Sequence, residues 1–496
     1  MVVRVLKCHC MERSAQTELA EDKARLVALY ASALARLGVL EVQLEKFREQ
    51  YTPLAYGALL NQTKNFILHF SRAQDELRGS DFSIQQKKEY GDLLRVLDAQ
   101  VGACLSAPNW QSPSFWHTHL PQAGTDAGFV SASSGDYKRD MHRQEKEYVQ
   151  KFVKEYVDHP LRLAPFAYAT SSGMSAVTTV LTHLQTKVGN SDIVLAGKSS
   201  YFQNKWLLQK LFGTRVRYVD EFDTDRIIRL AKELRPPLVF LDSLCGAESL
   251  PVPNLPVLIP ALSKILSNTS TFVLDNTGLG PMYQPLRDLP WSPFGMHVVV
   301  VESLLKFHQF GLDRVSGGII WTPSLVENGL FEARMHMGTI IPDASVSALP
   351  EPNRALQDAR LIRIGHNAHL LATLLDSFVR EHVTVVEKVV HPGLSHYEGY
   401  AWTKDTAFQG PFVTLRFRDG KRSVSHYDAF VLRVQKIGKE KNVHIIGGTS
   451  FGFDTTRLYV TARYATDLTE PFVRIALGTE TVDELHALAD VFIQAL

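Results

Sequence analysis

The sequence is poor in cysteine, in excess charge and in long apolar runs. Only four cysteines occur in 496 residues, which argues against a disulfide-stabilised fold and favours a reducing compartment. The formal net charge is +1, so no strong field selects a nucleic acid or an anionic membrane as a partner. No apolar run approaches the roughly twenty residues that span a bilayer, and the first residues hold too short an apolar stretch for a signal peptide. We therefore expect a cytoplasmic protein with neither kind of partner.

The composition is that of a globular protein with more than one domain. Hydrophobic residues make up 45% of the chain and charged residues 21%, and the length is large for one domain. Cys8, His9 and Cys10 could supply half of a metal site. No matching second pair of ligands follows them, so we predict that the protein binds no metal and that this end of the chain is solvated.

The chain divides into four segments by its pattern. Apolar residues at intervals of three and four over 20–51 and 81–105 indicate helices, which form a subdomain or an oligomer contact. Strands and helices then alternate from about residue 168 to residue 320, which indicates a mostly parallel sheet with helices on both faces. We place the boundaries as a helical N-terminal extension over 1–105, a connecting arm at the edge of the site over 106–160, a large α/β domain over 161–345 and a smaller α+β domain over 346–496.

Polar residues end three of the predicted strands. Asp242, Asp275 and Ser303 each follow an apolar stretch. Because the carboxyl ends of parallel strands meet at one edge of a sheet, where α/β proteins bind their ligands, we expect these side chains to converge.

Lys306 lies just beyond the strongly apolar strand predicted over 297–303. A buried lysine is costly unless it is paired or neutral. Two interpretations follow. Lys306 could form an ion pair with Asp275, or it could be a Schiff-base lysine, with Asp275 bound to the ring nitrogen of pyridoxal phosphate.

The second interpretation requires a phosphate site on the same edge. Ser171, Ser172, Gly173 and Met174 precede a predicted helix, and free amides at a helix N-terminus bind phosphate. A serine that caps an ordinary helix looks similar, so the stretch counts only together with Asp275 and Lys306 further along the chain.

These motifs, in this order, resemble the Cys/Met-metabolism family of fold-type-I pyridoxal-phosphate enzymes, which includes methionine γ-lyase, cystathionine γ-synthase and the cystathionine lyases. The resemblance runs from about Gly135 to the C-terminus. It implies the α/β fold of type I PLP-dependent transferases, with a mostly parallel central sheet flanked by helices, and pyridoxal 5'-phosphate as the cofactor. It also implies a homodimer or homotetramer whose active sites are shared between subunits.

The resemblance assigns the contacts to the cofactor phosphate. The stretch "GDYKR" is similar to the family's Tyr-x-Arg, so Tyr137 and Arg139 would reach the phosphate from the neighbouring subunit. The stretch "SSGMSAV" is similar to its Ser-Gly-Met loop, so Ser172, Gly173 and Met174 would form the phosphate cradle. The stretch "ESLLKF" is similar to its Ser-x-Thr-Lys, which makes Ser303 a further phosphate ligand.

The remaining site residues follow in the same way. Lys306 would bind the cofactor covalently, Asp275 in "VLDNTG" would pair with the ring nitrogen, and Tyr201 would stack on the ring. Tyr201 would also activate Lys306 or protonate the leaving group. Ser450 in "GTSFG" would position the substrate, and Arg474 in "FVRIALG" would bind its α-carboxylate.

The chain departs from the family pattern at two places in the site. Leu305 stands where the family has threonine, which removes one hydroxyl contact to the phosphate. Cys245 and Gly246 stand near the position of the family's asparagine. These departures predict a divergent member, and they keep open the alternative of a binding scaffold that has lost catalysis.

The resemblance implies a reaction on an amino acid, with Lys306 as the base. We favour γ-elimination from a substrate with a leaving group at Cγ. Replacement at Cγ of an activated homoserine is the alternative, and β-elimination comes third.

Overall fold

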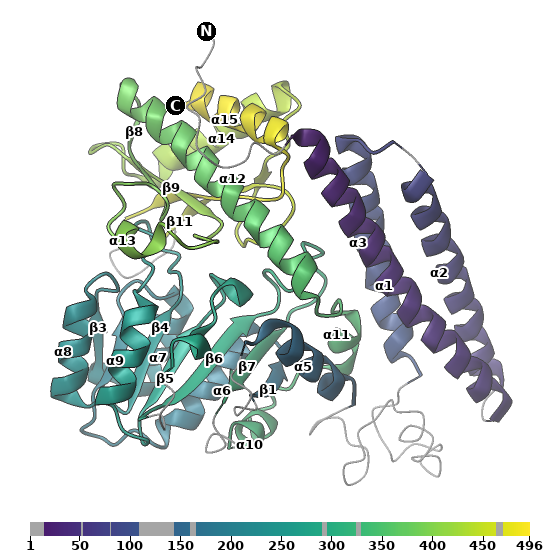
Figure 1. Ribbon diagram of the computed structural model, residues 1–496, viewed down its shortest axis with the longest axis horizontal. Helices are drawn as coiled ribbons and strands as arrows, with labels where there is room; N and C mark the ends of the chain where they lie inside the picture. The colour runs from purple at the N-terminus through teal and green to yellow at the C-terminus, as the bar shows by residue number, and fades with distance from the viewer. Residues whose placement is uncertain are drawn as a thin grey trace.

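The computed structural model describes residues 14–50, 53–79, 81–108, 143–158, 165–289, 295–323, 329–462 and 470–496. Figure 1 shows three groups of elements: long N-terminal helices at one side, an α/β group around a large sheet, and a smaller α+β group above it. The domain boundaries at 105, 160 and 345 stay predictions.

The N-terminal segment is helical, as its periodicity predicts. It forms α1 (Ala15–Gln50), α2 (Pro53–Gly79) and α3 (Ile84–Ser106). Ser83 begins α3 with a capping box, in which its hydroxyl accepts from the Gln86 amide and the Gln86 side chain accepts from the Ser83 amide. The three helices share one apolar core, in which Tyr30, Leu37 and Phe70 are fully buried.

Helix α1 is long and apolar enough, by length and composition alone, to cross a membrane. It is the single such helix in the part of the chain that the structure describes. The expectation that no apolar run approaches this length does not hold for α1, because one 18-residue window of this helix holds at most two charged residues. Helices in the cores of soluble proteins pass the same test, and Leu26, Leu40 and Leu44 of α1 lie in the core shared with α2 and α3.

The large sheet has seven strands in the order β1-β7-β6-β5-β4-β2-β3. Strands β2 to β6 run parallel to one another, whereas β7 is antiparallel to both β6 and β1. The mostly parallel sheet is confirmed, although β7 was not predicted. Its strands are β1 (Phe166–Thr170), β2 (Val194–Gly197), β3 (Val216–Val219), β4 (Leu238–Asp242), β5 (Thr271–Asp275), β6 (His297–Ser303) and β7 (Gly318–Thr322).

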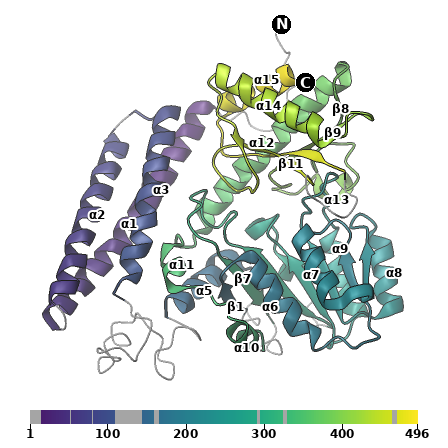
Figure 2. The ribbon, with the colours of Figure 1, turned by 180° about the vertical axis from the view of Figure 1, so that it is seen from behind.

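Helices cover both faces of this sheet, which is why its central strands are apolar on both sides. One face carries α5 (Arg143–Tyr156), α8 (Thr224–Leu234) and α9 (Leu255–Ile265). The other carries α6 (Gly173–Gln185), α7 (Phe202–Phe212) and α10 (Gly329–His336), seen in Figure 2. Shorter elements are the 3-10 turns Gly213–Arg215, Gly280–Met282 and Pro285–Arg287 and the helix α11 (Asp343–Ala348).

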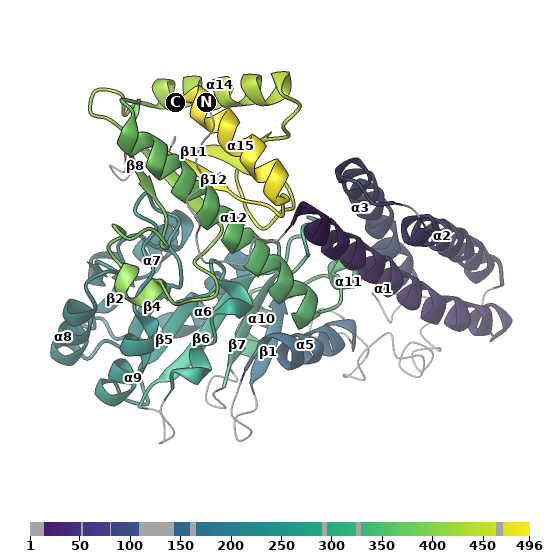
Figure 3. The ribbon, with the colours of Figure 1, turned by 45° about the horizontal axis from the view of Figure 1, so that its top comes forward.

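The predicted long helix is α12 (Arg354–Glu381), and it leads from the large sheet to the C-terminal elements (Figure 1). There a second sheet has the order β10-β11-β12-β9-β8, and α12, α14 and α15 pack on one of its faces (Figure 3). Its elements are β8 (Val386–Val390), α13 (Tyr400–Thr403), β9 (Phe412–Phe417), α14 (Val424–Glu440), β10 (Ile446–Gly447), β11 (Arg457–Thr461), β12 (Phe472–Ala476) and α15 (Val482–Ala495).

The strand predicted over 442–450 shortens to the two residues of β10. Ile446 and Gly447 pair with Arg457 and Leu458 of β11, and the chain between them leaves the sheet. Ser450 lies in that excursion, outside the regular ladder. The loss of the strand therefore places a predicted site residue on a loop.

Candidate active site

The polar residues that end the central strands lie at one edge of the large sheet, as predicted. Asp242 of β4 and Asp275 of β5 are register partners in a parallel pair. The adjacent strand β6 extends two residues further and ends at Ser303. Two carboxyl groups and a hydroxyl therefore share the edge at which ligands bind in α/β sheets.

The carboxyl group of Asp275 is held by two donors. Its Oδ2 accepts from Asn204 Nδ2 at 2.9 Å, and its Oδ1 accepts from the Thr277 amide at 3.1 Å. Asp242 Oδ2 accepts from the Tyr201 amide at 2.8 Å. Burial raises the pKa of both carboxyl groups, and the charge of Asp275 raises the pKa of Asp242 further. Within the described residues, neither forms an ion pair with lysine or arginine, and a positive charge placed beside them would favour their ionised forms.

Lys306 lies in the turn that follows β6. Its Nζ donates to Ser450 Oγ at 2.6 Å and lies 5.4 Å from the centroid of the Phe451 ring. Burial lowers the pKa of Lys306 to about 8, and the positive charge of Arg474 contributes to the shift. With a pKa near 8, about a tenth of the amine is neutral at pH 7, compared with less than about a thousandth at the ordinary value.

Arg474 projects from β12, with its guanidinium carbon 4.9 Å from the centroid of the Phe412 ring. Burial lowers its pKa to about 10. Among the described residues, no carboxylate forms an ion pair with Arg474. A partly buried guanidinium without an anion is an evident binding site for a ligand carboxylate.

Tyr201 immediately precedes α7, and the residue is 43% exposed. Burial of the rest of the residue raises the pKa of its phenol, an effect that Arg474 opposes and Asp275 reinforces. These charge interactions place Tyr201 near both residues. The phenol stays protonated at neutral pH, so it can donate a proton.

The residues predicted to form a phosphate cradle lie together. Ser172 caps α6, with its hydroxyl accepting from the Ser175 amide at 3.0 Å. A side chain at Gly173 would place its Cβ 2.8 Å from the Cβ of Ser303, so only glycine allows this close approach. The start of α6, the half-buried Met174 and the end of β6 are therefore neighbours.

Tyr137 and Arg139 lie outside the described residues, and their predicted contacts stay predictions. The two departures from the family pattern lie at the site. Leu305 is half-buried beside Lys306. A Cβ built on Gly246 would lie 3.3 Å from Nη1 of Arg474, so a larger residue there would touch the guanidinium.

Sequence reasoning missed two residues that hold this site together. Asn204 donates to Asp275, and it lies in the first turn of α7, three residues after Tyr201, which precedes that helix. Thr277 Oγ1 accepts from the Ser303 amide at 3.0 Å. It belongs to the Asp-Asn-Thr stretch that was recognised, although no role was assigned to it.

Solved structures show which known fold this chain has. The cystathionine γ-synthase of Xanthomonas oryzae pv. oryzae, solved in complex with cystathionine, has a TM-score of 0.58 and 19% identity, covering 74% of this chain and 91% of that one. The apo methionine γ-lyase CalE6 of Micromonospora echinospora has a TM-score of 0.57 and 21% identity, covering 74% and 92%. The fold is that of fold-type-I pyridoxal-phosphate enzymes.

The chain belongs to the family of Cys/Met metabolism PLP-dependent enzymes, whose family model matches residues 103–493, well over half of its length. Among curated proteins, the bifunctional enzyme flvA of Aspergillus flavus is 26% identical over 319 residues. That match covers 63% of this chain and 37% of the relative, so the chain spans less than half the length of that protein.

The residues present fit pyridoxal phosphate, the cofactor of this family. The buried carboxyl groups of Asp242 and Asp275 have no ion-pair partner among the described residues, and a protonated ring nitrogen would supply the positive charge. Gly173 and Ser303 form a close-packed corner at the start of α6, suited to a phosphate. Lys306 offers an amine with a lowered pKa.

Proposed function

We propose that the protein is a pyridoxal-phosphate-dependent lyase that eliminates a leaving group from Cγ of an amino acid. The observation that carries the proposal is the position of Lys306, whose amine has a lowered pKa and contacts Ser450 at 2.6 Å. When bound, the cofactor supplies an electron sink for the carbanion that forms at the substrate.

Arg474 binds the substrate through its α-carboxylate. The guanidinium offers parallel N–H donors that match the two oxygens of a carboxylate. Because no carboxylate of the described residues occupies it, Arg474 is available to the substrate without first breaking an internal ion pair.

Lys306 moves the protons. Its neutral amine accepts the proton from Cα. The amine must then give this proton up to the conjugated system of the bound cofactor before it can accept the proton from Cβ that γ-elimination requires. Ser450 orients this amine through the hydrogen bond to Oγ. Tyr201 donates a proton to the leaving group, because its raised pKa keeps the phenol protonated. Asp275 keeps the proton on the ring nitrogen of the bound cofactor.

Replacement at Cγ is a second candidate, favoured by the exposure of Tyr201. Since 43% of this residue is accessible, the site is open on that side to a second, nucleophilic substrate. The two reactions share every step up to loss of the leaving group, and they differ in whether a thiol or water reacts afterwards.

We also propose that the protein is a homodimer or homotetramer, in which Tyr137 and Arg139 of one subunit reach the phosphate bound by another. A subunit isolated by dilution should then lose cofactor. Sedimentation and cofactor absorbance over a dilution series test this, and a monomer that keeps its cofactor and full activity would contradict it.

The experiment that tests the proposed reaction begins with the absorbance of the purified protein. We expect a visible band from bound pyridoxal phosphate that is absent in Lys306→Ala. Incubation with O-acetylhomoserine, methionine or cystathionine should release a 2-oxo acid and ammonia. Release of acetate from O-acetylhomoserine only when a thiol is added, with formation of a thioether, would favour replacement. A protein that binds no pyridoxal phosphate would refute an enzymatic role and leave the binding scaffold.

A further inference from the structure

Two loops meet at Lys306. The first follows Lys306 and includes Phe310 and Gly311, and the second runs from Gly448 to Thr456 and carries Ser450. They touch at Gly452, where an added Cβ would lie 2.5 Å from the carbonyl oxygen of Lys306. The hydrogen bond from Lys306 to Ser450 joins them a second time.

Both loops hold a non-glycine residue in the left-handed region of the backbone map. The φ angle is 51° at Phe310 and 74° at Ser450. Such residues are strained, and the conformation persists only where surrounding contacts hold it. The question is which contacts hold Phe310 and Ser450.

The N-terminal helices hold the first loop. Phe310 and Leu312 are buried members of the core that α1, α2 and α3 share. Two arginines of these helices donate to the loop backbone: Arg25 of α1 reaches the Phe310 carbonyl at 3.4 Å, and Arg95 of α3 reaches the Gly311 carbonyl at 3.2 Å. The strained turn after Lys306 is thus held by packing and hydrogen bonds to helices α1 to α3.

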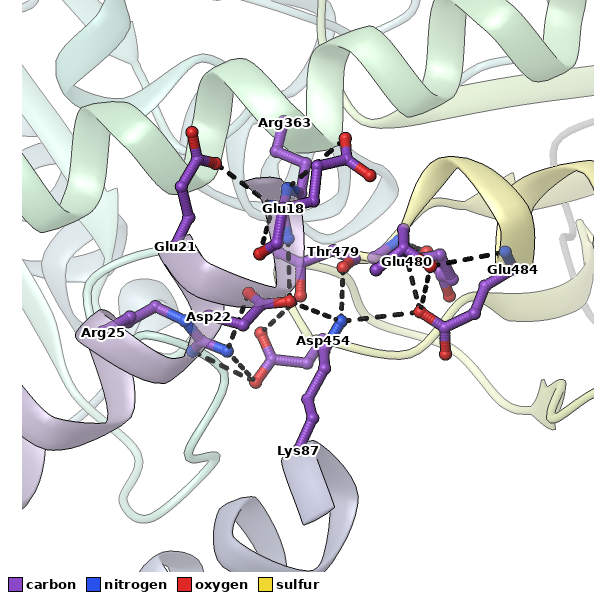
Figure 4. Close-up of polar contacts among 12 residues, drawn as sticks. Glu18, Glu21, Asp22, Arg25, Lys87, Arg363, Asp454, Thr479, Glu480 and Glu484 are labelled. Carbon is purple, nitrogen blue, oxygen red and sulfur yellow. Dashed lines mark hydrogen bonds and ion pairs between the residues drawn. The ribbon is translucent and has the colours of Figure 1, made fainter. Parts of the chain in front are cut away.

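The same helices hold the second loop through Asp454. Arg25 donates to Asp454 Oδ2 through both terminal nitrogens at 3.3 Å, as Figure 4 shows. Arg360 of α12 donates to the other oxygen at 3.1 and 2.9 Å, and also to the Gly452 carbonyl at 2.9 Å. Burial opposes ionisation, but Arg25 and Arg360 hold the pKa of Asp454 well below its ordinary value. The carboxylate is therefore charged at neutral pH.

A third contact reaches the segment after β12, the strand of Arg474. Lys87 of α3 donates to the Thr479 carbonyl at 2.7 Å and pairs with Asp22 of α1 at 2.9 Å (Figure 4). Glu18 of α1 accepts from the Val482 amide at 2.7 Å. The N-terminal helices thus contact the segments that carry or follow Lys306, Ser450 and Arg474.

We propose that helices α1 to α3 position the active site, and that Arg25 is the central positioning residue. Arg25 acts through Phe310 and Asp454: it fixes both loops, and so keeps Ser450 opposite Lys306. The residue lies in a part of the chain that precedes the match to the family model, which begins at residue 103. This role rests on the proposed function of Lys306 and Ser450.

The test compares Arg25→Met with Gln74→Leu in the full-length protein. Arg25→Met keeps the aliphatic stem and removes the guanidinium. Gln74→Leu is the matched control, because Gln74 donates to the Val27 carbonyl at 3.0 Å inside the same helical core and forms no hydrogen bond with the described residues of either loop. Hydrogen–deuterium exchange is followed over 306–313 and 446–456, with and without added pyridoxal phosphate.

We expect exchange in both segments to accelerate roughly tenfold or more in Arg25→Met, since a buried charge pair is broken, and to change less than about twofold in Gln74→Leu. In the enzyme with its cofactor, kcat should fall more than KM changes, because Arg474 still binds the carboxylate. Arg25→Lys should restore part of both effects, since it returns the charge without the two-pronged contact.

Unchanged exchange in Arg25→Met would overturn the proposal, as would equal acceleration in Gln74→Leu, which would indicate general loosening of the helices. If Arg25→Met does not fold, Arg25→Lys combined with Arg95→Met weakens the same contacts and is judged by the same criteria. The exchange measured without substrate or cofactor does not depend on the proposed reaction, so failure of that reaction appears separately, as absence of the cofactor band.

Discussion

Lys306 donates a hydrogen bond to Ser450 Oγ at 2.6 Å, across 144 residues of sequence. The contact joins the loop after β6 of the large sheet to the loop between β10 and β11 of the small one. Ser450 adopts a left-handed backbone conformation to make it. A strained residue that meets an amine with a lowered pKa is typical of a site organised for chemistry.

Ser450→Ala should therefore reduce kcat by roughly ten- to a hundredfold, because an unoriented amine transfers protons less efficiently. KM should change little, since Arg474 still binds the substrate carboxylate. Steady-state kinetics with the best substrate of the panel measure both values. A variant with unchanged kcat would show that this hydrogen bond does not contribute to catalysis.

Covalent uptake of pyridoxal phosphate should depend on pH through Lys306. The lysine attacks as the neutral amine, and burial lowers its pKa to about 8. The uptake rate should rise roughly tenfold per pH unit below 8 and level off above it. Stopped-flow absorbance on cofactor-free protein gives the profile. A midpoint near 10 would contradict the lowered pKa.

Variants of Arg474 and Arg457 distinguish the effect of positive charge on the pKa of Lys306 from the binding of the substrate. Both lower the pKa of Lys306 through their positive charge, but Arg457 donates to the Thr449 carbonyl, and its guanidinium carbon lies 3.5 Å from the Phe453 ring centroid. Arg474→Met and Arg457→Met should both shift the pH midpoint of cofactor uptake upward. Only Arg474→Met should raise KM, by roughly a hundredfold or more, since a charged hydrogen-bonded pair with the substrate is lost. Equal KM values in the two variants would exclude Arg474 as the carboxylate site.

Asp242→Asn should stabilise the cofactor-free protein at neutral pH. Burial raises the pKa of Asp242 above its value in the unfolded chain. The protonated carboxyl group is therefore compatible with folding at low pH, and stability is lost as pH rises through the folded-state pKa and the buried group must ionise. Asparagine removes that loss and still accepts from the Tyr201 amide. Thermal unfolding should show a gain on the order of 1 kcal/mol at pH 8 and much less at pH 4. An equal gain at both pH values would show that the charge is not the cause.

Gly246→Ala should weaken substrate binding without changing the fold. The added Cβ would lie 3.3 Å from Nη1 of Arg474, which is tight enough to displace the guanidinium by a few tenths of an ångström. We expect KM to rise several-fold, by roughly 1 kcal/mol of lost binding, with the melting temperature unchanged. Gly91→Ala, which adds a Cβ in open space at a residue of α3 without a positive φ, gives the stability scale for comparison. A lower KM would show that the extra methyl group improves the position of Arg474.

Local pattern was enough to predict the central strands and several helices. The buried strands β4, β5 and β6 are unbroken apolar runs, and α12 and α15 have the helical period. By contrast, β7 and β11 were not recognised, and β10 is shorter than predicted, because strand pairing depends on distant partners and not on local composition. The same holds for α1, whose composition alone does not distinguish a core helix from a membrane span.

The sequence by itself determined the family, the cofactor and the order of the motifs, because each motif is a short run whose residues act together locally. Only the tertiary structure decided that Asp242 faces Asp275 in register, that Asn204 supports it, and that Arg25 reaches Asp454. The last contact joins residues 429 positions apart. Side chains so distant in sequence leave no periodic or compositional signal, since their proximity depends on how whole helices and sheets pack.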